Sequence, residues 1–253
     1  PIEILKPSLI IFLASIFSNN NNFLIKFIIS SFISLISVFI LLLQPDYTQA
    51  LLVLIIWLTV IFMTGINLIV IFSTVSFIIC IMISVLFIFK DNFTYIFARF
   101  ERWLGTNDIS YQSEKSIDAI QHGGFFGRGI GEGILKEKIP EAHTDYVLAS
   151  VSEEFGIMAI FIILIIVFSL FMRVFAICQT DISKFKKYSL VTLSTLILLQ
   201  IFINVGVTIN LLPSTGMTFA FLSYGGSSIL TSSFIMGIIL SLTKKKYWWQ
   251  KFY

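Results

Sequence analysis

Long apolar stretches dominate this sequence, and they leave too few charged residues to build a water-facing surface. Of its 253 residues, 57% are hydrophobic and 12% are charged, and the mean hydropathy is +0.95. A soluble domain would carry about 25% charged residues. A helix that spans a bilayer needs about 20 mostly apolar residues. The composition therefore predicts an integral membrane protein that crosses the membrane several times.

The apolar stretches are continuous and do not alternate with polar residues at every second position. This pattern favours membrane helices over a β-barrel. We expect an all-α, polytopic transmembrane helical bundle that forms a single membrane domain over residues 1–253. The predicted spans are 4–18, 27–43, 49–64, 67–89, 147–172, 188–208 and 219–242.

Lysine and arginine in the short connections predict the orientation, because these residues gather on the cytoplasmic side. The C-terminal tail carries Lys244, Lys245, Lys246 and Lys251, and the connection 173–187 carries Arg173, Lys184, Lys186 and Lys187. Placing both inside makes the C-terminus cytoplasmic and puts the long connection 90–146 outside. The net charge of +3 is too small to indicate a nucleic-acid partner.

The connection 90–146 differs from the rest of the chain, because it holds nine of the fourteen acidic residues and both histidines. Long loops usually exist for a function or are disordered. Interspersed aromatic and aliphatic residues argue against disorder. We therefore expect an ordered, partly re-entrant loop on the outer face.

A glycine-rich run, 123–133, lies within this loop. It lacks the βαβ context of a dinucleotide-binding fingerprint. The glycines instead allow tight turns and close approach of the backbone to a ligand or to a membrane surface. Arg128, Lys136 and Lys138 could meet an anionic headgroup, and simple interfacial cations are an equal alternative.

The string Pro-Glu-Ala-His-Thr-Asp ends at Asp145, just before an apolar stretch. Thr144 or Asp145 could cap the following helix, and catalysis by Asp145 is the competing interpretation. Glu141 and His143 are too few to indicate a metal site.

Two further groups of polar residues accompany predicted spans. Glu153 and Glu154 should face the protein interior or a wet cavity, because charge in a membrane span is costly. The run 213–228 places hydroxyls and glycines at the start of the last span. In membrane proteins such residues mark close helix packing or irregular backbone that lines a cavity.

Several of these strings are specific when taken together: Gln112-Ser113, the Gly-Gly-x-x-Gly-x-Gly run from Gly123, the string that ends at Asp145, Glu-Glu-Phe-Gly from Glu153, and Leu-Ser-Tyr-Gly-Gly-Ser-Ser around Tyr224. They resemble the SEDS family of peptidoglycan glycosyltransferases, and the resemblance covers essentially the whole chain. Members have ten spans, so the chain is expected to hold the last seven. Within the family it looks more like the division branch than the elongation branch.

The resemblance implies an enzyme that polymerises lipid II into glycan strands for septal wall synthesis, cell division and cell shape, and that releases undecaprenyl diphosphate. It implies Asp145 as the catalytic carboxylate. The residues that it implies for substrate binding are Gln112, Ser113, Gly123, Gly124, Gly127, Arg128, Gly129, Lys136, Glu141, His143, Thr144, Glu154, Ser223, Tyr224, Gly225 and Gly226.

A divalent cation, Mg²⁺ or Mn²⁺, could balance the charge of the diphosphate as a cofactor, and no metal ligands are predicted. The implied partners are lipid II, a class B penicillin-binding transpeptidase and other divisome proteins, at the septum of the bacterial inner membrane. Two alternatives remain open: a flippase or transporter for a lipid-linked precursor, and an inactive, truncated remnant.

Overall fold

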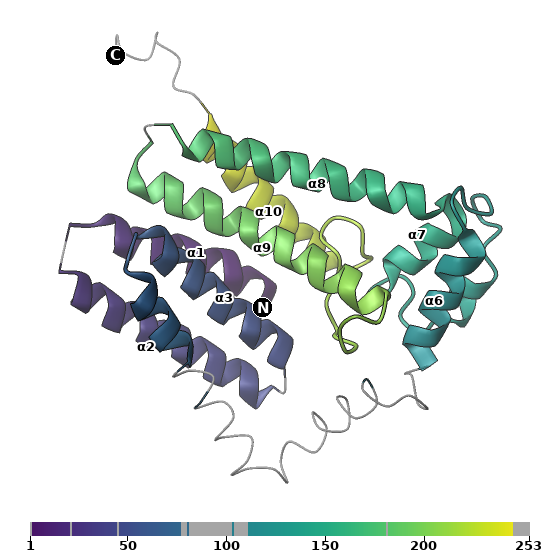
Figure 1. The fold of residues 1–253 in the computed structure, drawn as a ribbon, viewed down its shortest axis with the longest axis horizontal. Helices are drawn as coiled ribbons and strands as arrows, with labels where there is room; N and C mark the ends of the chain where they lie inside the picture. The colour runs from purple at the N-terminus through teal and green to yellow at the C-terminus, as the bar shows by residue number, and fades with distance from the viewer. Residues whose placement is uncertain are drawn as a thin grey trace. The chain divides into compact units, whose positions relative to one another are not determined.

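The structure is a computed structural model that describes residues 2–20, 22–44, 46–76, 80, 103, 111–180 and 182–244. Among these residues every regular element is a helix, so the all-α prediction is confirmed (Figure 1). The helices are α1 (Ile2–Ser18), α2 (Phe23–Leu43), α3 (Tyr47–Met63), α6 (Tyr111–Gly123), the 3₁₀ helix η2 (Leu135–Lys138), α7 (Val147–Phe155), α8 (Ile157–Cys178), α9 (Lys184–Thr208) and α10 (Gly226–Thr243). Residues 68–76 are also helical.

Four of the described helices, α2, α8, α9 and α10, are long and apolar enough to cross a membrane. The shorter α3 is also apolar, and α1 is 17 residues long. This supports the prediction of an integral membrane protein with several spans. Of the predicted span 67–89, residues 77–79 and 81–89 lie outside the described residues. So does most of the predicted loop before Tyr111.

The structure differs from the prediction in the region 147–172, which forms two helices instead of one. Helix α7 ends at Phe155, and α8 begins at Ile157. Between them Gly156 has a φ of +81°, a conformation in the left-handed region that glycine tolerates and other residues rarely adopt. The apolar span therefore starts at Ile157, and Glu153 and Glu154 precede it.

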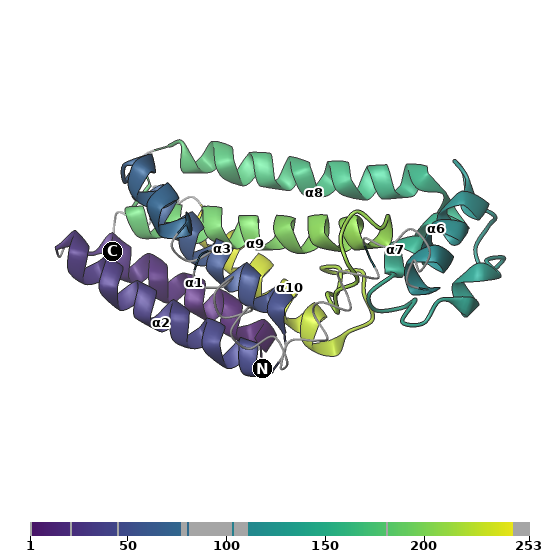
Figure 2. The same cartoon turned by 60° about the horizontal axis from the view of Figure 1, so that its bottom comes forward.

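The last predicted span, 219–242, also begins later than expected. Helix α10 starts at Gly226, and the chain between α9 and α10 contains no helix from 211 to 225 (Figure 2). Left-handed backbone occurs here at Asn210 and Phe221. Of the two alternatives for 213–228, close helix packing or irregular backbone that lines a cavity, the structure shows irregular backbone up to Gly225.

The chain divides into two compact units. The first comprises 1–60, 168–198 and 226–253, and the second comprises 61–167 and 199–225. In the first unit, α1 packs against α2 and α10. Lys6 of α1 is fully buried, and its Nζ donates a hydrogen bond to Gln49 Oε1 at 3.0 Å and pairs with Glu3 at 2.8 Å. A cation needs such partners when it leaves water.

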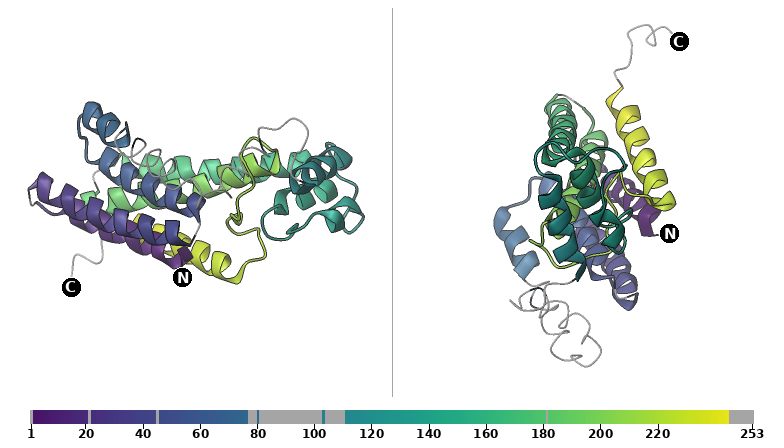
Figure 3. Two further views of the ribbon diagram at one scale, coloured as in Figure 1. Left: turned by 90° about the horizontal axis from the view of Figure 1, so that it is seen from below. Right: turned by 90° about the vertical axis from the view of Figure 1, so that its right-hand side faces the viewer.

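In the second unit, α6 packs against α7, and η2 contacts both helices (Figure 3). Their apolar core also includes the C-terminal end of α9. It consists of Ala119, Ile139, Ala142, Tyr146, Ala149 and Val207, with Ile120, Leu135 and Ile203 packed against it. All the polar contacts described below belong to this unit.

Candidate active site

The segment that ends at Asp145 forms a tight turn before α7. The carbonyl oxygen of Glu141 accepts hydrogen bonds from the N–H groups of Thr144, Asp145 and Tyr146 at 3.1, 3.1 and 3.3 Å. This turn gives Glu141 a left-handed φ of 61°. Such backbone costs a non-glycine residue about 1–2 kcal/mol, so surrounding contacts must hold it in place.

Tyr146 fixes the end of this turn, because its side chain is buried in the apolar core of the second unit. It is also the N-cap residue of α7, which starts at Val147, and its side chain makes no capping hydrogen bond. The N-cap position of α7 therefore falls on Tyr146, and not on Thr144 or Asp145 as one alternative expected.

Asn204 of α9 holds the backbone of Asp145 from the opposite side. It is buried, and its Nδ2 donates hydrogen bonds to the carbonyl oxygens of Asp145 and Met217, both at 2.8 Å. One amide therefore ties the turn before α7 to the irregular segment after α9. Asn204 belongs to none of the motifs singled out in the sequence, although a polar amide inside the predicted span 188–208 is a usable signal.

The Leu-Ser-Tyr-Gly-Gly string lies directly beside the turn. Ser223 Oγ donates a hydrogen bond to the carbonyl oxygen of Thr144 and accepts one from the N–H of Phe219 at 2.7 Å. The N–H of Tyr224 donates to the carbonyl oxygen of His143 at 2.8 Å. Two motifs that lie about eighty residues apart in the sequence therefore meet around one turn.

Gly216 brings the same irregular segment close to the Asp145 carboxyl group. A Cβ atom added at Gly216 would lie 3.8 Å from Asp145 Oδ2. Gly216 therefore lies close to the carboxyl group, and His143 and Tyr224, which bond to each other through their backbones, are exposed. Half-burial and neighbouring backbone dipoles suit a carboxylate that takes a proton from a bound hydroxyl group.

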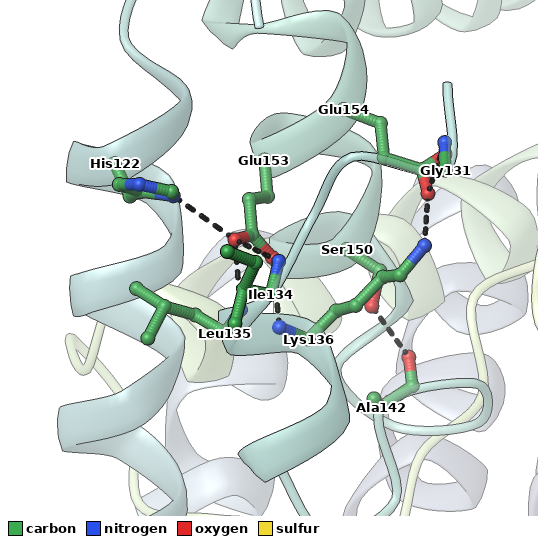
Figure 4. A network of polar contacts seen from close by, with 9 residues as sticks. All are labelled: His122, Gly131, Ile134, Leu135, Lys136, Ala142, Ser150, Glu153 and Glu154. Atoms are coloured by element: carbon green, nitrogen blue, oxygen red, sulfur yellow. Dashed lines mark hydrogen bonds and ion pairs between the residues drawn. The ribbon is translucent and has the colours of Figure 1, made fainter. Parts of the chain in front are cut away.

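A second polar cluster lies at the other end of α7, around Glu153 (Figure 4). Its buried carboxylate accepts hydrogen bonds from three consecutive backbone N–H groups: Ile134 and Leu135 reach Oε1 at 3.0 and 2.9 Å, and Lys136 reaches Oε2 at 2.7 Å. His122 Nδ1 lies 3.0 Å from Oε1. The prediction that Glu153 faces the protein interior is confirmed.

Burial by itself raises the pKa of Glu153. Hydrogen bonds from Leu135, Lys136, His122 and Ile134 stabilise the charged carboxylate and outweigh that effect, so the pKa lies below the ordinary range for glutamate. Glu153 is therefore ionised at neutral pH, and it stabilises the loop that surrounds it.

Of the three cations that could meet an anionic headgroup, Arg128 and Lys136 have different surroundings. Lys136 Nζ forms an ion pair with Glu154 Oε1, which also accepts a hydrogen bond from the N–H of Gly131 at 3.2 Å. Arg128 is exposed, and its Nε donates to the carbonyl oxygen of His122 at 2.8 Å. Arg128 thus presents the rest of its guanidinium to the surroundings, whereas Lys136 is paired within the protein.

The glycine-rich run packs its backbone directly on α7. A Cβ atom at Gly123 would overlap the carbonyl oxygen of Ser152, and one at Gly127 would overlap that of Glu154. The N–H groups of Arg128 and Gly129 donate to the carbonyl oxygens of Glu153 and Glu154 at 2.9 and 3.1 Å. The predicted close approach of backbone therefore occurs, and its observed partner is α7.

The remaining predicted substrate-binding residues lie elsewhere in the described structure. Gln112 and Ser113 are in the first turn of α6, where Ser113 is buried, and Gly226 is the first residue of α10. Gly124 forms part of the turn after α6. Among the described residues, no three His, Cys, Asp or Glu side chains lie close enough to hold a metal ion.

Comparison with known proteins identifies the family of this chain. The family model described as cell cycle protein (FtsW/RodA/SpoVE) matches residues 1–247. The chain belongs to this family. The family resemblance inferred from the motifs is confirmed.

Similar proteins are named as probable peptidoglycan glycosyltransferases. A probable peptidoglycan glycosyltransferase FtsW from Caulobacter vibrioides is 29% identical over 97% of the chain. A protein of the same name from Lactococcus lactis is 42% identical over 59% of the chain and 36% of its own length. The chain spans 63% of the length of the Caulobacter relative.

Two solved structures share the fold, each at 23% sequence identity and over 98% of the chain. One was reported under the words "Structural coordination of polymerization and crosslinking by a peptidoglycan synthase complex", with a TM-score of 0.76 and 70% of that chain covered. The other is the rod shape determining protein RodA of Thermus thermophilus, with a TM-score of 0.64 and 66% covered.

Gly156→Ala should strongly destabilise the protein. The left-handed backbone costs about 1–2 kcal/mol with alanine, and the new Cβ would also overlap the carbonyl oxygen of Phe125. Gly131→Ala is a matched control, because its φ of +83° is similar but nothing lies within 4 Å of the added Cβ. Thermal unfolding in detergent should show a clearly larger loss for Gly156→Ala, and equal losses would contradict the packing described.

Glu153 should make stability depend on pH in the acidic range. Because its folded-state pKa is depressed, its contribution is complete above the unfolded value of about 4.3 and is lost as the pH falls through the folded-state value. Glu153→Gln should melt at a lower temperature at pH 7 and lose part of the pH dependence. Glu132→Gln, at an exposed position, should keep the wild-type profile.

Asn204→Ala should loosen the turn that carries Asp145. It removes the donor to the carbonyl oxygens of Asp145 and Met217, at a cost of about 1–3 kcal/mol for an oxygen that is buried. Hydrogen exchange of the backbone N–H groups in 141–146 should become faster. Thr208→Val serves as the control, because the Thr208 hydroxyl donates to the carbonyl oxygen of Asn204 within α9. This variant should leave hydrogen exchange in 141–146 unchanged.

Proposed function

We propose that the chain carries the catalytic site of a membrane glycosyltransferase that polymerises lipid II. The observation that supports this most directly is the position of Asp145. Its backbone is held by Asn204, and its neighbours are held by Ser223 and Tyr224, so one carboxyl group is fixed beside irregular backbone. Family membership and the names of the relatives support the reaction class.

In the proposed reaction, the 4-hydroxyl oxygen of one lipid-linked disaccharide attacks the anomeric carbon of another. A new C–O bond forms, and the bond from the anomeric carbon to the diphosphate oxygen breaks. Asp145 takes the hydroxyl proton, and undecaprenyl diphosphate leaves as an anion. Glycoside hydrolases need a second carboxylic acid to protonate the leaving group. A diphosphate leaves without protonation, so a single carboxylate suffices.

The leaving diphosphate needs positive charge nearby. Arg128 is the better placed of the two candidates, because its guanidinium is exposed and suits bidentate contact with phosphate. Lys136 would have to exchange Glu154 for the phosphate. Mg²⁺ is commonly held by substrate phosphates and one or two carboxylates. We propose Mg²⁺ or Mn²⁺ as a substrate-bound cation and assign it no ligands.

The proposed setting is septal wall synthesis at the bacterial inner membrane, with the loop outside and the C-terminus in the cytoplasm. The FtsW names of the relatives support the division role. A class B penicillin-binding transpeptidase is the proposed partner, with other divisome proteins nearby. The solved complex that coordinates polymerisation and crosslinking supports such a pairing.

Asp145→Asn should reduce polymerisation at least about 100-fold, the usual contribution of a general base. The measurement is glycan product from lipid II in liposomes that contain the full-length parent protein and its transpeptidase. Asp118→Asn is the control, because Asp118 pairs with Lys115 on the surface of α6 at 2.8 Å and should leave activity unchanged.

The same liposomes separate the competing functions. If wild type and Asp145→Asn make equal amounts of polymer, Asp145 is not the base. If neither makes polymer but both carry lipid II across the bilayer, the protein is a transporter. If neither reaction occurs with the wild-type protein, the protein is inactive under these conditions and the proposed function fails.

A further inference from the structure

Large apolar side chains in the glycine-rich loop are mostly exposed. Phe125, Phe126 and Ile130 are 70%, 86% and 78% exposed. Phe125 and Phe126 belong to the turn 124–126, directly after α6. A cluster of exposed large apolar residues marks an interaction surface more often than chance. We call these three residues the loop tip.

The loop tip is fastened to the first turn of α8. The N–H of Ile157 donates to the carbonyl oxygen of Gly124 at 3.0 Å, and the N–H of Met158 lies 3.4 Å from the carbonyl oxygen of Phe125. Gly156 has no side chain, which lets the backbone of Phe125 pass against it. These backbone contacts, all within one compact unit, therefore hold the loop tip beside the N-terminal end of α8.

The first turn of α8 is a boundary between polar and apolar sequence. Glu153 and Glu154 end the preceding helix, and α8 then continues for 22 residues with a hydropathy of 2.9. Only 6% of its most apolar window is buried inside the protein. Phe161, Ile162 and Ile165 are among its outward-facing residues. In an integral membrane protein this surface contacts lipid, so α8 enters the bilayer near Ile157.

We propose that the loop tip inserts into the interfacial layer of the bilayer beside the start of α8. Phenylalanine and aliphatic side chains are typical of segments that lie in this layer. The glycine-rich loop is then anchored to the membrane at one edge, and to α7 at the other.

The loop tip is continuous with the lipid-facing surface of α8, and this favours lipid over a protein partner as the group that covers it. The loop tip adjoins the lipid-facing surface of α8 at the level where that surface begins, so one bilayer covers both. No rearrangement is needed, because the fastening contacts are backbone hydrogen bonds already in place. This inference goes beyond the proposed function and does not depend on it.

Spin labels in lipid bilayers test the insertion. Single cysteines at Phe126, Glu132 and Ile162 would be introduced into a chain with Cys80→Ser and Cys178→Ala, and labelled with a nitroxide. Collision rates with oxygen, which concentrates in lipid, and with a water-soluble nickel chelate report the depth of each label. Glu132 is the exposed loop control, and Ile162 is the control in lipid.

We expect the Phe126 label to have an oxygen-to-nickel ratio between those of the two controls. A label at Phe125 gives a second reporter if Phe126→Cys does not fold. A Phe126 ratio equal to that of Glu132 would overturn the proposal. So would a label that stays accessible to nickel in the chain alone and becomes protected only when the transpeptidase is added, because that result identifies a protein interface.

Discussion

Glu153 accepts hydrogen bonds from three consecutive backbone N–H groups and from His122 while fully buried. This carboxylate joins α6, the end of the glycine-rich loop and η2 to the last turn of α7. An uncompensated charge at this depth would be strongly unfavourable, so the carboxylate and its donors need each other. Because Tyr146 alone separates Asp145 from the start of α7 at Val147, the same contact fixes the helix that carries the candidate catalytic turn.

The residues around Asp145 were expected because their motifs resemble those of a known family. Hydropathy predicted the helical membrane architecture, because continuous apolar runs are a local feature of a chain. Hydropathy placed two span boundaries incorrectly for a related reason. Hydropathy around 147–172 does not register a single left-handed glycine, and Gly156 is what divides α7 from α8. The late start of α10 depends on tertiary contacts made by Ser223.

Asn204 shows what sequence reasoning overlooks most easily. Ile203 and Val205 on either side of it are apolar, and its two acceptors come from residues 59 and 13 positions away. No spacing rule links such partners. For the glycine-rich run, the sequence pattern predicted close approach of the backbone but did not identify the element that it packs on. Close backbone approach was expected toward a ligand or a membrane, and Gly123 and Gly127 make that approach to α7.

The contacts around the candidate site share one further property: Asn204, Ser223 and Tyr224 all bind carbonyl oxygens of residues 143–145 or 217. Main-chain carbonyls are present whatever side chain a residue carries. The position of residue 145 therefore does not depend on which side chain it carries. During evolution, the side chain at position 145 could change to one of different acidity or length while the same hydrogen bonds kept the backbone in place. A change of chemistry at this position would therefore need few other substitutions.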